Sequence, residues 1–389
     1  MRFRILPLLS TPIAALLLLC GCGSQVAAQT ENAITSADPS SSAPETPIDE
    51  NRPTAPPPRV SDETLSSFVD ALSAKHAFNR DELLSLLRQA QIRDDILAAM
   101  DRPAEAKPWH EYRLIFLTDE RIHGGVDFMR KHAKLLREAE KMYGVPRQII
   151  TAIIGVETRY GLRTGNFRVV DALFTLAFLY PKRSDFFRKE LEEFLLLARE
   201  ENRDPLTLSG SYAGAMGVPQ FMPSSFRRYA VDFDADKKRD IWQNPADAIG
   251  SVANYFKVHG WEKDQPVVTP ARIVGPKHES LLAAGIKPHI QVRALPKQDV
   301  RLPRKQKGDL LAALFELEEP TAKKYWIGFN NFYVITRYNR SNLYAMAVYQ
   351  LSEEILKHHS KPAKKSARTA APATKPVRQP APAKPSSSP

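Results

Sequence analysis

The sequence predicts a mainly helical protein of the α+β class that carries a small β-containing insertion. Apolar residues recur at the three- and four-residue spacing of amphipathic helices over most of the stretch 59–358. Short β-branched runs separated by Pro and Gly replace this pattern at about 265–338. The length of 389 residues and the hydrophobic content of 43% are sufficient for one large or two ordinary globular domains.

Separate helices are expected where an apolar stripe follows a capping residue. Ser61 precedes Leu65, Val69 and Leu72, which share one helix face, so a first helix is predicted to begin there. Within the insertion, residues 307–317 are expected to form a further helix. Other helices are predicted at 81–90, 93–101, 126–142, 147–159, 171–180, 185–201, 245–259 and 340–357.

Residues 1–21 are expected to be a lipoprotein signal peptide. A basic start precedes the apolar stretch Ile5–Leu19, which is short for a permanent membrane-spanning helix. The sequence LCGC that follows is similar to the lipobox of bacterial lipoproteins, with Cys22 as the residue that would be acylated. Because Gly23 replaces the Asp of the usual inner-membrane signal, we expect a periplasmic protein anchored to the inner leaflet of the outer membrane. Cleavage near residues 26–28, giving a soluble periplasmic protein, is the alternative.

The two ends of the mature chain are expected to be disordered. Residues 22–58 are rich in Pro, Ser, Thr and Ala and are predicted to be a tether, while 359–389 form a Pro/Ala/Lys-rich tail. This tail contains seven of the basic residues and no acidic residue, so much of the net charge of +11 lies outside the folded domain. We therefore expect no nucleic-acid partner. The two cysteines lie at positions 20 and 22, so the fold at 59–358 must rely on core packing without disulfides.

Glu157 is the first candidate for chemistry. It stands near the end of a predicted helix that is apolar on nearly every side, and Gly161 and Gly165 then break the pattern. A carboxyl group surrounded by such apolar surface should have a raised pKa, because burial disfavours its charged form. A carboxyl that stays protonated near neutral pH is suited to act as a general acid on a glycosidic oxygen.

A block of small residues, GSYAGAMGVPQFMPSSF at 210–226, is the second candidate. Its Gly and Ala residues allow the backbone to approach a ligand closely, and Ser211, Gln220 and Met222 between them are expected to contact it. The block lacks the Lys-Ser/Thr ending of a phosphate-binding loop. Amide, hydroxyl and aromatic groups in alternation are typical of a sugar site.

Four ordered blocks give the chain a specific resemblance. VETRYG, the small-residue block, DAIGSVANYFKVHGW (247–261) and TRYNRSNLYAMAV (336–348) closely resemble the lytic murein transglycosylase B family. The similarity extends from about Tyr112 to Leu351. It implies a lysozyme-like core domain with an additional helical region. The implied reaction cleaves the β-1,4 bond between N-acetylmuramic acid and N-acetylglucosamine in peptidoglycan, without water, and closes a 1,6-anhydro ring.

The resemblance also carries individual residues. Glu157 matches the single catalytic acid of the family, and Phe186 stands where members can have a tyrosine. The positions that match glycan-facing residues of the cleft are Ser211, Gln220, Tyr112, Tyr255, Tyr338 and Asn339. One acid implies a substrate-assisted mechanism, in contrast to the two carboxylates of ordinary glycosidases. Asp171, the nearest other carboxylate in sequence, is expected to be a helix cap.

A run of aspartates raises the question of a metal. Four of them occupy positions 1, 3, 5 and 9 of an EF-hand-like loop, but Lys237 replaces the Gly of position 6 and Gln243 the Glu of position 12. In the family, a later aspartate can close such a loop. The candidate ligands of a structural calcium are Asp232, Asp234, Asp236, Asp240 and Asp247, with sodium or a merely solvated loop as alternatives.

No cofactor is expected to be required for activity, and peptidoglycan glycan strands are the expected partner of a monomeric enzyme that works beside other cell-wall enzymes. Two other function classes remain open from sequence alone. The long tails suit a catalytically silent peptidoglycan-binding module, although the retained Glu157 and Gln220 argue against it. A calcium-responsive adaptor would rest on the aspartate loop alone.

Overall fold

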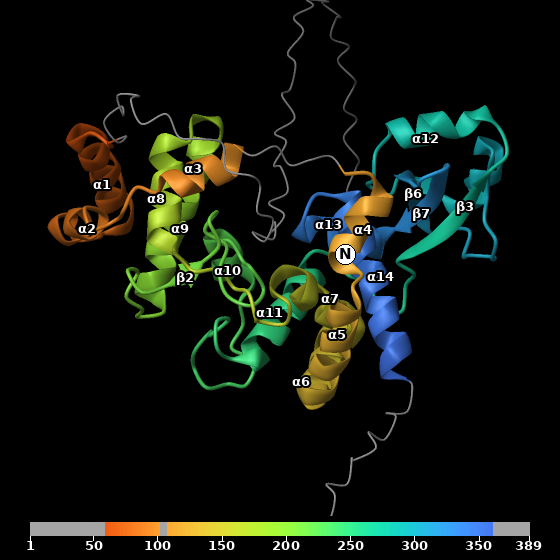
Figure 1. The fold of residues 1–389 in the computed structure, drawn as a ribbon, viewed down its shortest axis with the longest axis horizontal. Coiled ribbons are helices and arrows are strands. Elements are labelled where there is room, and N and C mark those ends of the chain that lie inside the picture. Colours follow the sequence, from red (N-terminus) through yellow and green to blue (C-terminus); the bar gives the residue numbers. More distant parts are fainter. Residues whose placement is uncertain (1–58, 102–106, 361–389) are drawn as a thin grey trace, which may run out of the picture.

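The computed structural model describes residues 59–101 and 107–360. The predicted signal peptide, Cys22, the tether and nearly all of the tail lie outside the described residues. The described chain is mainly helical with two small sheets, which confirms the predicted fold class. Figure 1 shows the helices α1 (Asp62–His76), α2 (Arg80–Leu87), α3 (Asp94–Asp101), α4 (Trp109–Phe116), α5 (Asp119–Lys131), α6 (Ala133–Tyr143), α7 (Arg147–Thr158), α8 (Val169–Leu179), α9 (Ser184–Glu200), α10 (Pro223–Tyr229), α11 (Pro245–Val258), α12 (Glu279–Ala283), α13 (Asn330–Tyr338) and α14 (Asn342–His359).

The predicted helices outside the expected insertion are found, with local corrections at their ends. Ser61 caps α1 by accepting a hydrogen bond from the Thr64 amide, as its position suggested. The helix expected at 126–142 is two helices, α5 and α6, which are separated at His132. Four helices of the described chain, α4, α10, α12 and α13, were not predicted from the sequence pattern. No helix within 59–101 or 107–360 is both long and apolar enough to cross a membrane.

Helix α7 lies at the centre of the main core. Ile150, Ala152 and Ile153 are completely buried and point to different sides of the helix. Helices α5, α6, α11 and α14 pack around it, as Figure 1 shows. Burying one such isoleucine stabilises the fold by roughly 1.5–3 kcal/mol, so this helix is anchored on all sides. The carboxyl group that it carries is therefore held in a fixed place.

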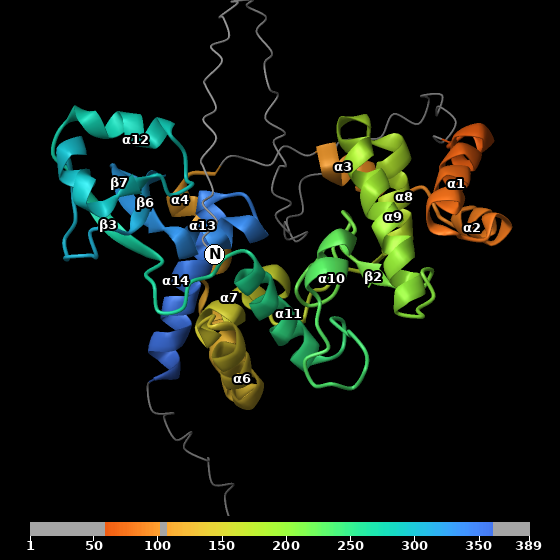
Figure 2. The ribbon, with the colours of Figure 1, turned by 180° about the vertical axis from the view of Figure 1, so that it is seen from behind.

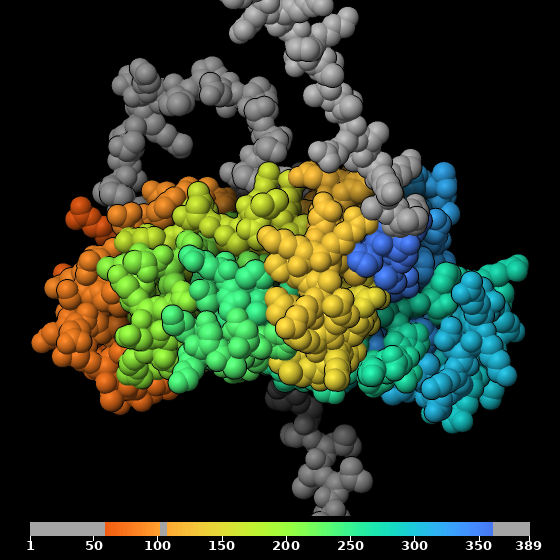
Figure 3. Space-filling view, turned by 90° about the horizontal axis from the view of Figure 1, so that it is seen from below, coloured from red at the N-terminus to blue at the C-terminus, as the bar shows by residue number. Residues whose placement is uncertain are grey.

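A five-stranded antiparallel sheet forms one end of the molecule. Its strands lie in the order β4-β6-β7-β3-β5. It has a small core of its own, which includes Leu295, Leu314 and Ile327. Figures 2 and 3 place this sheet opposite the end formed by α1 and α2. Its strands are β3 (Val268–Ile273), β4 (Ile290–Gln291), β5 (Val300–Arg301), β6 (Leu311–Glu318) and β7 (Lys323–Phe329).

The helix predicted at 307–317 is wrong, because residues 311–318 form strand β6. Its Leu, Ala and Glu residues favour a helix in isolation. The segment is instead a central strand with both faces covered, and Phe315 stacks on Phe332 at a ring distance of 4.6 Å. Tertiary packing therefore overrides local propensity at this place. The last part of the expected insertion, 330–338, is helix α13.

A second, two-stranded sheet joins two loops of the main domain. Strand β1 (Phe167–Arg168) pairs antiparallel with β2 (Ser209–Gly210). Next to it, Gly165 has a φ of +88°, and a Cβ atom there would lie 2.1 Å from the carbonyl oxygen of Gly210. Only glycine fits at this position, for both conformational and steric reasons.

We expect Gly165→Ala to lower the free energy of unfolding by about 3 kcal/mol or more, because a rigid backbone oxygen occupies the space of the new methyl group. Gly285→Ala is the matched control, since its φ is +80° and nothing lies within 4 Å of the new Cβ. The control should cost about 1 kcal/mol, for backbone strain alone. Denaturant unfolding of both variants measures the difference, and equal losses would contradict the steric argument.

Candidate active site

A cleft of about 610 Å³ is lined by residues between Ile115 and Arg340. Glu157 lies in its wall, together with residues of the small-residue block, the start of α10 and the end of α13. Six of the predicted site residues line it together with Glu157, namely Ser211, Gln220, Met222, Tyr255, Tyr338 and Asn339. Residues more than 180 positions apart in sequence therefore meet at one place.

Glu157 stands in the last turn of α7 and is half-buried. The hydroxyl of Tyr344, from helix α14, donates a hydrogen bond of 2.5 Å to its Oε1. Burial raises the pKa of Glu157 to about 7, although the Tyr344 bond and the positive charge of Arg121 act in the opposite direction. The carboxyl group is thus poised between its two protonation states at neutral pH, as its apolar helix suggested.

The end of α7 is tied directly to the small-residue block. The Thr158 hydroxyl donates to the Val218 carbonyl at 2.9 Å. Gln220 has a φ of +52°, and its Nε2 donates to the Thr164 and Gly217 carbonyls. Ser211 Oγ accepts from the Ala215 amide. These bonds hold the block rigid against helix α7.

An aromatic wall, formed by Tyr255 and Tyr338, packs directly against the block beside the cleft. Tyr255, on α11, donates its hydroxyl to the Arg337 carbonyl at 2.5 Å and stacks on His259 at a ring distance of 4.0 Å. Tyr338 donates its hydroxyl to the Pro219 carbonyl at 2.6 Å. Burial lowers the pKa of His259, so this ring is neutral at neutral pH. Both tyrosine hydroxyls thus bond backbone carbonyls of neighbouring segments.

Two other predicted residues differ in their placement. The Oδ1 atom of Asn339 is buried and has no hydrogen-bond partner within the described chain, so an acceptor is available beside the cleft. Tyr112 is not among the lining residues, and Ile115 and Phe116 of the same helix line the wall there. Burial raises the pKa of Tyr112, and the charge of Glu157 adds to this shift, which places Tyr112 near the carboxyl group.

Sequence reasoning missed three groups of the site. Tyr344 lies within the fourth resemblance block, but nothing in the local pattern showed that it bonds Glu157. His259 belongs to the third block and was not singled out. The third group is a set of arginines along the cleft, whose lining has Glu157 and Glu190 as its acidic side chains. The arginines are Arg121, Arg159, Arg163, Arg183, Arg228, Arg337 and Arg340. The cleft is therefore cationic, which suits a glycan that bears carboxylates.

Glu190 is a second carboxylate in the cleft wall, and it is buried. Its Oε1 accepts from the Ser224 hydroxyl at 2.6 Å and its Oε2 from the Ser224 amide at 2.9 Å. Both oxygens thus fasten the first turn of α10, which is a structural role. Asp171 does not cap a helix as expected. It lies inside the first turn of α8, where it forms an ion pair with Arg168 at 2.7 Å and accepts from the Gln91 amide.

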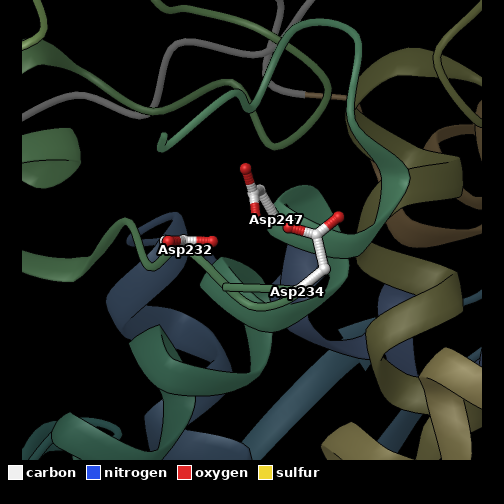
Figure 4. Close-up of side chains that lie close together, drawn as sticks. All are labelled: Asp232, Asp234 and Asp247. Atoms are coloured by element: carbon white, nitrogen blue, oxygen red, sulfur yellow. The ribbon is translucent and has the colours of Figure 1, made fainter. Parts of the chain in front are cut away.

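Three aspartates converge on the loop between α10 and α11, as Figure 4 shows. Carboxylate oxygens of Asp232, Asp234 and Asp247 all lie within 4.8 Å of one another. Asp247 is buried, and its pKa is raised by burial and by the charges of the other two. Three carboxylates at this spacing fit a hard cation such as calcium, which prefers oxygen ligands.

The two remaining aspartates of the predicted set lie outside this cluster. Asp236 accepts from the Lys238 amide, and Asp240 pairs with Arg203 at 3.3 Å. Lys237, at the position where glycine was expected, adopts the left-handed conformation with a φ of +71°. The loop therefore keeps the local turn in spite of the missing glycine.

Comparison with known proteins places the chain in a family. A model of the Transglycosylase SLT domain matches residues 61–353. Membrane-bound lytic murein transglycosylase B of Escherichia coli (strain K12) is 44% identical over 298 residues, which cover 74% of this chain and 81% of the relative.

Solved structures agree with this assignment. Soluble lytic transglycosylase SltB1 from Pseudomonas aeruginosa is 52% identical, with a TM-score of 0.73 over 76% of this chain and 99% of the relative. Escherichia coli lytic transglycosylase Slt35, solved in complex with calcium, is 42% identical, with a TM-score of 0.69 over 76% and 94% of the two chains. SltB3 from Pseudomonas aeruginosa, in complex with NAG-NAM-pentapeptide, is 29% identical, with a TM-score of 0.68 over 76% and 79%. The chain therefore belongs to the lytic murein transglycosylase B family and is a peptidoglycan lytic transglycosylase.

Proposed function

We propose that Glu157 carries out both proton transfers of the transglycosylase reaction, first as acid and then as base. The observation that carries this proposal is a carboxyl group with a pKa of about 7 in the wall of the cleft, fixed by Tyr344. A group with this pKa can donate and accept a proton at neutral pH at a small free-energy cost in either direction. The second carboxylate of the cleft, Glu190, has both oxygens engaged with Ser224, which supports a mechanism with a single acid.

In the proposed reaction, protonated Glu157 donates its proton to the glycosidic oxygen while the bond from that oxygen to C1 of the muramic acid breaks. The carbonyl oxygen of the 2-acetamido group stabilises the positive charge that develops at C1. The Glu157 carboxylate then accepts the proton of the C6 hydroxyl, and the C6 oxygen bonds to C1. A 1,6-anhydro ring is formed, Glu157 is protonated again, and no water is consumed.

The glycan would lie in the cleft, against the small-residue block and the aromatic wall that packs beside it. Ser211 and Gln220 lie on one side, and their positions are fixed by the loop bonds described above. The unpartnered Oδ1 of Asn339 can accept a hydrogen bond from a sugar hydroxyl or an acetamido N–H. A buried acceptor left without a partner is costly, so its pairing by substrate would add to binding. We propose these residues, with Met222, Tyr255, Tyr338 and the nearby Tyr112, as the glycan-binding set.

We further propose that acylated Cys22 anchors the enzyme to the outer membrane, with the folded domain in the periplasm. The proposal rests on the lipobox-like sequence and on the name of the Escherichia coli relative, which is membrane-bound. Several acyl chains would hold the protein firmly, since each buried methylene adds about 0.8 kcal/mol.

We expect Glu157→Gln to reduce the release of anhydro-muropeptides from sacculi by about 10³-fold or more, because the amide can neither donate nor accept the proton. The fold should be unaffected, as judged by the melting temperature. Product masses identify the reaction, since hydrolysis would leave reducing ends in place of anhydro ends. Turnover within tenfold of the wild type would remove Glu157 from the mechanism.

We expect the rate to fall as the pH rises through about 7, because the acid form of Glu157 is then lost. Tyr344→Phe removes a bond that lowers the pKa of Glu157, so the basic limb of the pH–rate profile should move to higher pH. The maximal rate should fall by about tenfold with the lost bond. Tyr349→Phe on the same helix α14 is the control, because Tyr349 does not line the cleft. An unshifted limb in Tyr344→Phe would contradict the assignment of the pKa.

We propose that Asp232, Asp234 and Asp247 hold a structural calcium ion. Calcium should raise the melting temperature of the wild type by about 2 °C or more at saturating concentration. Asp234→Asn should abolish this shift, yet in chelator it should melt no lower than the wild type, because it removes repulsion between like charges. Asp236→Asn is the matched control outside the cluster and should keep the calcium response. A wild-type protein whose melting is unchanged by calcium would exclude the site.

A further inference from the structure

One edge of the five-stranded sheet carries a concentration of exposed positive charge that the cleft does not account for. Between residues 272 and 307 there are nine Lys and Arg residues against two acids, Glu279 and Asp299. All nine basic residues are exposed. The lining of the cleft contains no residue between 260 and 336, so this charge belongs to a separate surface.

These cations lack carboxylate partners. Within the described residues, none of the nine forms a salt bridge, and the two arginines that make side-chain bonds do so with Gln291 and the Pro296 carbonyl. The helical part of the molecule is different, since Arg227 pairs with Glu193 and Glu200 there. The cations at the sheet edge are thus available to bind an anion from outside the chain.

The geometry concentrates the charge. Strand β5 is the outermost strand of the sheet, and its Arg301 lies directly opposite Arg272 of β3. Side chains of opposite residues project on the same face, and like charges in this position are destabilising. Arg301 also donates to the Pro296 carbonyl, which brings it beside Lys297. The loop that leads from β5 to β6 adds three more cations. The cationic edge consists of Arg272, Lys297, Arg301, Arg304, Lys305 and Lys307.

The chemistry of this edge favours a hydrated polyanion over a lipid bilayer. Membrane-surface binding combines positive charge with apolar side chains that enter the headgroup region. Within the sheet and its connections, the exposed large hydrophobic residues are only Val274 and Leu311 among those described. The cationic edge has no apolar face, and half of its six residues are arginines. Guanidinium groups bind carboxylates in a planar, bidentate manner, so the edge suits carboxylates.

We propose that the cationic edge binds the ionised carboxylates of peptide stems on peptidoglycan, outside the cleft. This inference rests on the proposed function, because it takes the polymer that the cleft acts on as the source of the carboxylates. Figure 3 shows the sheet at one end of the molecule. From this position, the cationic edge would contact a glycan strand other than the one bound in the cleft. The edge would hold the enzyme on the wall while the cleft releases one product and binds the next site.

The test compares two charge-neutralised variants of the whole chain. Arg301→Gln, Arg304→Gln, Lys305→Gln and Lys307→Gln together remove four charges of the edge. Lys131→Gln, Lys134→Gln, Arg137→Gln and Lys141→Gln together remove four exposed charges from α5 and α6 and serve as the control. Both sets are made in the Glu157→Gln background, so that the wall remains intact while binding to purified sacculi is measured by pelleting.

The edge variant should bind sacculi on the order of tenfold more weakly than the control at low salt, and this difference should shrink at high salt as the charges are screened. Removal of the stems with an amidase should lower binding of the parent protein to the level of the edge variant. Vesicles that contain phosphatidylglycerol should bind both variants equally. Equal pelleting of the two variants with sacculi, stem-independent binding, or an edge-dependent loss on vesicles alone would each overturn the inference.

Failure of the proposed function gives a different result. With Glu157 intact, the edge variant should release anhydro products from short soluble glycan fragments at the wild-type rate, because its residues lie outside the cleft. Absence of anhydro products from the wild type itself would refute the function while leaving the binding comparison readable. A loss of rate on soluble fragments that equals the loss on sacculi would overturn the inference, since it would show damage to the cleft instead of lost tethering.

Discussion

The structure depends on one constraint, which is that a carboxyl group must be held away from water without being paired to a cation. Glu157 meets it at the end of a helix whose other side chains are buried all round. Burial raises the pKa of Glu157 to about 7, and the hydroxyl of Tyr344 fixes one carboxyl oxygen without bringing a positive charge to it. A direct ion pair in place of Tyr344 would stabilise the carboxylate and abolish the acid. The apolar helix, the Tyr344 hydroxyl and the charge of Arg121 in the same cleft together set the pKa of Glu157.

The cleft around this group is assembled from segments that are rigid for separate reasons. The small-residue block is fixed by its own hydrogen bonds and by Thr158, and the aromatic wall is fixed by hydroxyls that bond backbone carbonyls. The aspartate cluster lies between α10 and α11, and α11 carries Tyr255. A cation there would relieve the repulsion that raises the pKa of Asp247 and would brace the loop behind the wall. Rigid walls lower the cost of ordering the site when a sugar binds.

The molecule presents two cationic surfaces of different construction. In the cleft, arginines surround a protonatable carboxyl and aromatic rings, which suits recognition of one glycan segment. At the sheet edge, exposed cations without carboxylate partners lie on strands β3 and β5 and in the segments next to β5. The first arrangement gives specificity, and the second gives salt-sensitive attachment to a polymer with many carboxylates. An insoluble substrate favours a division of this kind, because the enzyme must stay near the wall between cuts.

The sequence by itself determined most helices and pointed to Glu157 and the small-residue block as candidates, because helical periodicity and short-range turn chemistry are local properties. It could not determine that residues 311–318 form a strand, since a run of Leu and Ala buried on both faces has no period that separates strand from helix. The partners of the acidic groups also came only from the fold: Tyr344 with Glu157, Ser224 with Glu190, and Arg168 and Gln91 with Asp171. A carboxylate at a helix start looks the same in sequence whether it caps, pairs or catalyses. Its role is decided by which distant side chains the packing brings within hydrogen-bond distance.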